Sequence, residues 1–275
     1  ADIHEVSCIF TPENIADYTL VTDKVKVTVN PKSIEGATVT LNRNSFEYNT
    51  TAQAPTVTGV KLGDTMLNTA DYSVTVEAQT NAGDYTVTVN GEGNYTGTAT
   101  ASWTITPKTV TNPTIELIGS FSYTGEAIKP AVTVKDGETE IPAGEYEVSY
   151  KDNTNAGTAT VIIADKEGGN YTVSGSTTFQ IEKVDSEVSV APAVNELTYN
   201  GKEQPLVIAG TAKGGTMQYS LNGEDYSNVI PTGKDAKTYT VYYKVVGDKN
   251  HNDTIAQSVE VTIEKAVVTV TADDK

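Results

Sequence analysis

The chain alternates apolar and polar residues over short runs, and glycine, asparagine and aspartate gather between these runs. Alternation with a period of two is typical of strands that bury one face, and the intervening residue types favour turns. No apolar series with the spacing of a helix face extends beyond a single turn. The pattern therefore predicts an all-β protein whose strands are joined by short turns.

One stretch of this pattern recurs along the chain. Asn81–Gly97 reads NAGDYTVTVNGEGNYTG, and it returns at Asn155–Gly175, more loosely at Asp235–Asp253, and as a diverged copy at Ala1–Tyr18. Each copy precedes a second alternating run. Equivalent residues of these second runs stand 76, 76 and 82 residues apart, at Val29, Ile105, Ile181 and Ile263. A period of this length indicates small self-contained domains rather than a solenoid.

With about seven short strands in each repeat, two packed sheets are expected. We predict tandem immunoglobulin-like β-sandwich domains arranged as a rod, because no flexible Gly/Ser-rich spacer separates the repeats. Residues 1–32 supply only the last two strands of a truncated repeat, called repeat zero. Residues 33–107, 108–182 and 183–264 form repeats one, two and three, and 265–275 the first strand of a further repeat. The chain is thus expected to be a piece of a longer protein.

Alignment of the copies predicts which positions face the core. Cys8 falls in the column of Val89, and His4 and Val6 share its inward parity, so we expect a buried, unreactive thiol. In the final strand of each repeat, the expected inward pairs are Trp103 and Ile105, Phe179 and Ile181, Val261 and Ile263, and Val27 and Val29.

Two aromatic columns and one lysine column also recur. We interpret the aromatic residues as structural rings packed on the sandwich edge, with the hydroxyl or ring nitrogen bonded to backbone. The lysines lie at repeat junctions; they either face the linker or, as an alternative, form isopeptide bonds with asparagine. The columns are Tyr48, Tyr123 and Tyr199; Tyr18, Tyr95, Tyr171 and His251; and Lys32, Lys108, Lys183 and Lys265.

Repeat three departs from the others between Gly214 and Gly233. Two strand-like runs, MQYS and EDYS, flank Leu221–Gly223, and Asn-Gly in such a place is a strong hairpin signal. The sequence therefore predicts an additional hairpin in this repeat.

Composition excludes several classes of function. The formal net charge is −17, whereas nucleic acid and anionic lipid are bound by clusters of lysine and arginine. No apolar run approaches the ~20 residues of a membrane span, so membrane insertion is not expected. A single cysteine cannot form an internal disulfide.

Residue types that carry chemistry are scarce. The two histidines, His4 and His251, belong to different repeats and have no partner cluster, so we expect neither a catalytic triad nor a zinc site. No cofactor or enzymatic activity is predicted. The oxygen-rich loops Lys151–Gly157 and Gly247–Asp253 leave calcium open as an alternative to turn formation, although neither has EF-hand spacing.

The strings NAGTATV, GNYTG, FSYTG, LTYNGKEQ and AKTYTVYYKVVGDKNHNDT, with the lysines that end each repeat, resemble bacterial immunoglobulin-like tandem repeats of the MBG-like kind. The opening IFTPENIADYTLVTDKVKVTVNPKS is similar to a variant of the same repeats. The resemblance covers nearly the whole chain. It implies an extracellular location at the bacterial cell surface, in a large protein of gut-type Gram-positive bacteria or of some Bacteroidetes, and supplies no catalytic residues.

Two classes of function follow from this resemblance. The first is a non-catalytic stalk or spacer that presents adhesive or enzymatic domains, with the neighbouring domains of the parent chain as its partners. The second is an adhesin module that binds a glycan or a host ligand through exposed aromatic residues. The candidates are Tyr242, on the outward parity of its strand, and Tyr219 and Tyr226, found only in repeat three. Unpaired edges of repeat zero could also fold back on repeat one or support self-association by strand exchange.

Overall fold

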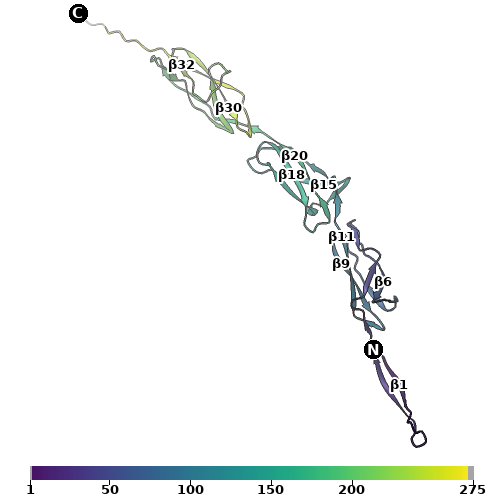
Figure 1. The fold of residues 1–275 in the computed structure, drawn as a ribbon. Helices are drawn as coiled ribbons and strands as arrows, with labels where there is room; N and C mark the ends of the chain where they lie inside the picture. The colour runs from purple at the N-terminus through teal and green to yellow at the C-terminus, as the bar shows by residue number, and fades with distance from the viewer. Residues whose placement is uncertain (1, 272–275) are drawn as a thin grey trace. The chain divides into compact units, whose positions relative to one another are not determined.

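The structure, a computed structural model, describes residues 2–271, and within this range the protein is all-β as predicted (Figure 1). The one helix in the described range is a single 3-10 turn, η1 (Ala143–Glu145). No helix among the described residues is long and apolar enough to span a membrane. The chain divides into two compact units. The first holds the residues up to Asn112 with Pro142–Glu147 and Ala164–Ser174, and the second holds the rest.

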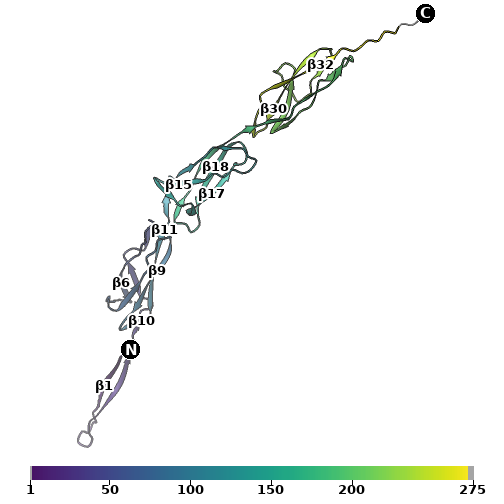
Figure 2. The same ribbon diagram turned by 180° about the vertical axis from the view of Figure 1, so that it is seen from behind.

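Repeat one is a sandwich of two sheets. A four-stranded sheet has the order β5-β11-β9-β8, in which β5 lies parallel to β11 and the other pairs are antiparallel. Val60 of the three-stranded sheet β4-β6-β7 packs against Val89 of the first sheet, and both are fully buried. Figures 1 and 2 show β6 beside the β9–β11 pair. The strands are β3 (Lys32–Ser33), β4 (Thr38–Leu41), β5 (Ser45–Glu47), β6 (Val57–Leu62), β7 (Thr65–Met66), β8 (Tyr72–Thr75), β9 (Gly83–Gly91), β10 (Tyr95–Thr96) and β11 (Thr98–Thr106).

The same strand order recurs in repeat two. Its four-stranded sheet is β14-β20-β18-β17, and its three-stranded sheet is β13-β15-β16. The edge strand β14 runs parallel to β20, with Phe121 paired to Ile181, as β5 runs parallel to β11 in repeat one. The strands are β12 (Lys108–Val110), β13 (Thr114–Leu117), β14 (Phe121–Ser122), β15 (Val132–Asp136), β16 (Thr139–Ile141), β17 (Tyr146–Lys151), β18 (Gly157–Asp165), β19 (Tyr171–Val173) and β20 (Gly175–Glu182).

Repeat three keeps the four-stranded sheet, with the order β24-β32-β30-β28, and replaces the second sheet by short two-stranded pairs. These pairs are β22–β27, β23–β26 and β25–β29. The strands are β21 (Val184–Asp185), β22 (Glu187–Val190), β23 (Ala193–Val194), β24 (Leu197–Thr198), β25 (Gln204–Pro205), β26 (Val207–Ile208), β27 (Thr211–Lys213), β28 (Gly215–Ser220), β29 (Thr232–Gly233), β30 (Thr238–Gly247), β31 (His251–Asn252) and β32 (Gln257–Glu264).

The predicted inward columns of repeats one to three are confirmed. All six residues are buried, while intervening residues such as Gln180 and Glu260 are exposed. Each buried aliphatic side chain of this kind contributes roughly 1.5 to 3 kcal/mol relative to exposure. The six are Trp103, Ile105, Phe179, Ile181, Val261 and Ile263.

Trp103 is the centre of one core cluster in repeat one. The centre of its ring lies 5.6 Å from the ring centre of Phe46, in an edge-on geometry, and 5.0 Å from that of Tyr85, in a tilted geometry. The side chain is 2% exposed, and its Nε1–H finds no hydrogen-bond partner among the described residues. A buried donor of this kind carries an uncompensated desolvation cost.

The prediction for repeat zero is confirmed for its two strands and wrong for the burial of their side chains. Its strands β1 (Asp2–Phe10) and β2 (Val21–Val29) pair in the register of β9 and β11, because His4 opposes Val27 as Tyr85 opposes Trp103. The expected burial is wrong: Cys8 is exposed, as are Val6, His4, Val27 and Val29. No other strand of residues 2–271 lies over either face of this hairpin, whose β1 is labelled in Figures 1 and 2.

The strand expected after Lys265 is also absent from its described part. Ala266–Thr271 has no regular secondary structure and its side chains are exposed. An alternating sequence becomes a strand only when another strand supplies hydrogen-bond partners, and this segment has none within residues 2–271. Ala1 and residues 272–275 lie outside the described range.

Candidate functional site

Tyr242 stands on the outer face of the main sheet of repeat three. It lies in β30 between the buried Val241 and Tyr243 and is itself half-buried, which agrees with its predicted outward parity. Its ring lies against Gly223, whose missing side chain would meet three ring atoms at 3.7 Å. The backbone of Gly223 has a φ of +76°, which favours glycine.

Tyr226 lies in the loop that follows β28 of the same repeat. The ammonium group of Lys244, on the outward parity of β30, lies 4.6 Å from the centre of the Tyr226 ring. A cation over an aromatic face at this distance is an attractive contact. It holds the half-buried ring of Tyr226 to the β30 strand.

Polar side chains shape the loop that carries Tyr226. Asn222 Oδ1 accepts hydrogen bonds from the backbone N–H groups of Glu224 and Asp225, each at 2.9 Å. Ser220 accepts from the backbone of Asn222 and Gly223. The predicted turn is therefore present, but the second run pairs with the first only through one bridge, Tyr219 with Ser227. The loop borders a hollow of ≈ 480 Å³.

Tyr219 is buried, contrary to the expectation that it is an exposed aromatic residue. It is 3% exposed, belongs to the core cluster of repeat three, and its hydroxyl accepts a hydrogen bond from Gly210 N at 3.0 Å. Because strand residues alternate in direction, Tyr219 points inward with Met217 and cannot share a face with Gln218. The candidates that keep a half-buried, partly accessible ring are therefore Tyr242 and Tyr226.

A second type of site lies where the loop between β8 and β9 of repeat one meets repeat two. Asn170 Oδ1 accepts a hydrogen bond from Ala82 N at 2.7 Å, and Asn170 Nδ2 lies 3.4 Å from Asn81 Oδ1. The rings of Tyr48 and Tyr171 meet edge to face at 5.3 Å. Glu145 holds Asn170 in place by accepting from its backbone N–H and its Nδ2.

The equivalent residues of the next pair of repeats make the same contacts. Asn250 Oδ1 accepts from Ala156 N at 2.9 Å, and Asn250 Nδ2 donates to Asn155 Oδ1 at 3.2 Å. The rings of Tyr123 and His251 meet edge to face at 5.4 Å. The Asn250 side chain is buried, with 5% exposure. We call these two sets of contacts the junction contacts.

The sequence reasoning missed these contacts. It placed both aromatic columns on the edge of a single sandwich, whereas the structure pairs a ring of one repeat with a ring of the next. His251 also bonds through Nδ1 to the Asp248 side chain rather than to backbone. The available signal was the asparagine that precedes the aromatic residue in repeats one to three, at Asn94, Asn170 and Asn250.

Within the lysine column, Lys183 has hydrogen bonds that indicate its role. Lys183 Nζ lies 3.3 Å from the backbone oxygen of Asp248 and 3.4 Å from that of His251. This is the geometry of an ammonium group donating to two carbonyl groups, and it favours the linker-facing interpretation for Lys183. Gly214, with a φ of +78°, lies where any side chain would collide with the His251 ring.

Side chains of both oxygen-rich loops form hydrogen bonds with backbone groups. Asp253 Oδ1 accepts from Gly247 N at 2.9 Å, and Asn153 Nδ2 donates to Ile128 O at 2.8 Å. Among residues 2–271, no group of three or more histidine, cysteine, aspartate or glutamate side chains is placed to hold a metal ion. The Asp253 contact favours the turn interpretation over calcium for Gly247–Asp253.

The pKa of the Asp248 carboxyl lies below its ordinary value. The main cause is the hydrogen bond from His251, at 2.6 Å, and the second is the backbone N–H of Asn250. A depressed folded pKa means that the ionised carboxylate stabilises the folded loop above the unfolded pKa near 3.8, and that this contribution is lost as pH falls through the lower folded value.

We therefore expect amide exchange at Asn250 and His251 to accelerate below about pH 4 relative to the rest of repeat three. Asp248→Asn keeps an acceptor oxygen but cannot be protonated, so this acid-dependent step should disappear. Hydrogen exchange followed by mass spectrometry between about pH 6 and pH 3 measures it, after correction for intrinsic exchange. An unchanged acid-dependent step in the variant would contradict the assignment to Asp248.

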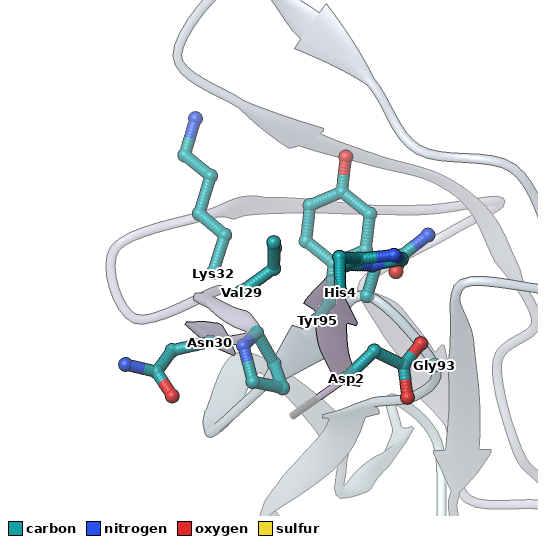
Figure 3. Close-up of a pocket in the computed structure, with 9 residues that line it drawn as sticks. Asp2, His4, Val29, Asn30, Lys32, Gly93 and Tyr95 are labelled. Atoms are coloured by element: carbon teal, nitrogen blue, oxygen red, sulfur yellow. The ribbon is translucent and has the colours of Figure 1, made fainter. Parts of the chain in front are cut away.

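A hollow of ≈ 560 Å³ adjoins Tyr95, which is the aromatic residue of repeat one equivalent to Tyr171 and His251. Figure 3 shows His4 and Tyr95 together on one side of this hollow, with Asn30 and Lys32 on the other. His4, expected on a core face, thus lines an open pocket.

The fold and the junction contacts define the class of this protein: a tandem array of immunoglobulin-like β-sandwich modules. A family model, described as the MBG domain, matches residues 37–109, which confirms for this stretch the resemblance seen in the sequence. No curated protein matches the chain.

Two solved structures of other proteins are similar at low identity. One is the cis-dimer structure of protocadherin gammaB7 EC3-6, at 13% identity and a TM-score of 0.24, covering 82% of this chain and 72% of that one. The other contains extracellular cadherin domains 3-6 of protocadherin Gamma B2, at 11% identity and a TM-score of 0.20, covering 83% and 73%. At these TM-scores neither structure informs the function of this chain.

Proposed function

We propose that this chain is a non-catalytic stalk or spacer segment of a large extracellular protein of the bacterial cell surface. In this role it holds adhesive or enzymatic domains of the same parent protein away from the surface. The observation that carries the proposal is the recurrence of the junction contacts, made once by Asn170 with Ala82 and again by Asn250 with Ala156. The MBG match of residues 37–109 supports the same class.

The junction contacts are suited to limiting motion between neighbouring repeats. Each hydrogen bond contributes about 0.5 to 1.5 kcal/mol, and each ring pair about the same again beyond its buried area. The linkers add little freedom, because Lys108 N and Val184 N bond directly to the backbone oxygens of Asn170 and Asn250. A spacer benefits from such junctions because bending at each one shortens its reach.

The test compares the flexibility of the full chain with and without the asparagine side chains. Asn250→Ala leaves Ala156 N–H without its acceptor, so we expect opening of this junction to become easier by about 1 to 3 kcal/mol. Asn170→Ala should do the same for Ala82. Single-molecule energy transfer between dyes in repeats one and three should give a narrow distance distribution for the wild type and a broader one for the double variant.

Asn228→Ala is the matched control, since this exposed asparagine lies in the loop before β29. It should leave the distribution unchanged. Equal distributions for the wild type and the double variant, or a wild type as broad as a Gly/Ser-linked chain, would reject the spacer role argued from these contacts.

A second candidate function is binding of a glycan or host ligand on the outer face of repeat three. It is favoured by the half-buried, outward Tyr242 and by Tyr226 with its neighbouring Lys244. Aromatic rings beside polar groups are common in sugar-binding surfaces. If this function holds, the chain binds a defined class on a glycan array and Tyr242→Ala weakens binding at least about tenfold. Binding that Tyr242→Ala leaves intact would remove this surface as the site.

A further inference from the structure

The outer edge of β2 is open in a way that no other repeat shows. β2 pairs with β1 along one side, and no strand of residues 2–271 pairs with its other side. In repeats one, two and three, the corresponding edge of the last strand carries a short parallel strand: β5 on β11, β14 on β20 and β24 on β32. In three repeats of the same chain, the corresponding edge therefore accepts a short parallel strand.

The three parallel strands share one sequence pattern and the backbone hydrogen bond made by their tyrosine. Each reads apolar–x–Tyr, in FEY, FSY and LTY. The tyrosine N–H donates at 2.9 Å to the residue that follows the final strand's buried aliphatic residue, as Tyr48 does to Thr106 O. Thr104 N in turn donates to Asn44 O at 2.9 Å. The common register makes Thr28 N and Asn30 O the equivalent donor and acceptor on β2.

The hairpin also offers an exposed apolar surface for the apolar residue of the pattern. Phe46 packs with Trp103 and Ile105 in one core cluster of repeat one. The equivalents of Trp103 and Ile105 in the hairpin are Val27 and Val29, which are 43% and 53% exposed. An apolar side chain added at this edge would cover both valines.

The tyrosine of the pattern would enter the hollow beside Tyr95. In the two junctions of known geometry, the tyrosine meets the aromatic residue of the next repeat edge to face, at 5.3 and 5.4 Å. Tyr95 is the equivalent aromatic residue, and it is half-buried beside a hollow of ≈ 560 Å³ that Asn30 and Lys32 also line (Figure 3). No ring pair is formed by Tyr95 among the described residues.

We propose that the β2 edge and the hollow beside Tyr95 form a binding site for an extended strand of the pattern apolar–x–Tyr. The strand adds parallel to Thr28–Asn30, its apolar residue covers Val27 and Val29, and its tyrosine packs on Tyr95. The site is independent of the stalk proposal, because it depends on the hairpin and on Tyr95 and not on the junction contacts. Self-association by strand exchange, expected from the sequence, is the case in which a second copy supplies the strand, and it stays a prediction.

The experiment uses the full chain and a fluorescent peptide with the sequence of residues 44–51, NSFEYNTT. Anisotropy should show saturable binding with a dissociation constant below about 1 mM, and replacing the peptide tyrosine by alanine should weaken it by about tenfold. Tyr95→Ala in the protein should weaken binding of the unmodified peptide by a similar factor.

Two proline variants separate strand addition from non-specific adhesion. Thr28→Pro removes the N–H that faces the open edge, and binding should be lost, because proline cannot donate. Thr22→Pro is the matched control: it has the same parity on the same edge but lies outside the proposed strand. It should bind as the wild type does. Absence of binding at about 1 mM peptide, or equal binding by both proline variants, would overturn the proposal.

Discussion

Trp103→Ala is expected to destabilise repeat one by about 3 to 5 kcal/mol, the range for removing a large buried aromatic side chain. The indole fills the space between Phe46 and Tyr85 in a core only a few side chains thick. A small sandwich buries little apolar surface in total, so neighbouring residues cannot close the cavity cheaply. Far-UV circular dichroism during urea unfolding of the full chain measures the loss, with hydrogen exchange in β9 and β11 assigning it to repeat one.

Trp103→Phe distinguishes the role of the ring from that of its N–H group. The Nε1–H lacks a partner within residues 2–271, so its removal offsets part of the lost packing. Phenylalanine already fills the equivalent position of repeat two, at Phe179. We expect Trp103→Phe to lie within about 1 kcal/mol of the wild type. Equal losses for phenylalanine and alanine would contradict this expectation.

Tyr219→Ala is expected to destabilise repeat three by about 3 to 5 kcal/mol for the same reason. Tyr219 is 3% exposed and packs in the cluster that includes Val241 and Ile263. Tyr219→Phe removes only the bond from Gly210 N and should cost about 1 kcal/mol. Urea unfolding with hydrogen exchange across β28 and β30 measures both.

Tyr226→Ala is the control for this series, because Tyr226 is half-exposed and bound mainly by Lys244. It should cost less than about 1 kcal/mol. A large effect at Tyr226 together with a small one at Tyr219 would reverse the assignment of the two side chains to surface and core.

The candidate surface on repeat three was only partly accessible to sequence reasoning. Parity along one strand correctly placed Tyr242 outward, since its neighbours Val241 and Tyr243 align with buried positions of other repeats. Tyr219 had no equivalent in the other repeats, so no column indicated its direction. Its burial follows from its pairing with Tyr243 across β28 and β30, a long-range contact that alternation within one run does not specify.

The junction contacts were recognised only as columns of residues. The sequence predicts structural roles for the four aromatic residues of these contacts, which agrees with their positions. It places each ring on the edge of its own sandwich, whereas each ring meets one of the neighbouring repeat. The four are Tyr48, Tyr123, Tyr171 and His251. An alignment compares equivalent positions and contains no information on which two different columns meet. Asn170 and Asn250 were missed for the same reason, although both recur in the sequence.

The sequence by itself determined the all-β class, the inward columns of repeats one to three and the common register of the four hairpins, because these depend on period-two alternation and turn residues within short segments. Tertiary structure alone decided which faces are covered. Cys8 and Val89 occupy the same position of the same hairpin, yet one is exposed and the other fully buried. The difference arises because burial requires a second sheet over the strand, and β6 supplies it to Val89 while no described strand supplies it to Cys8.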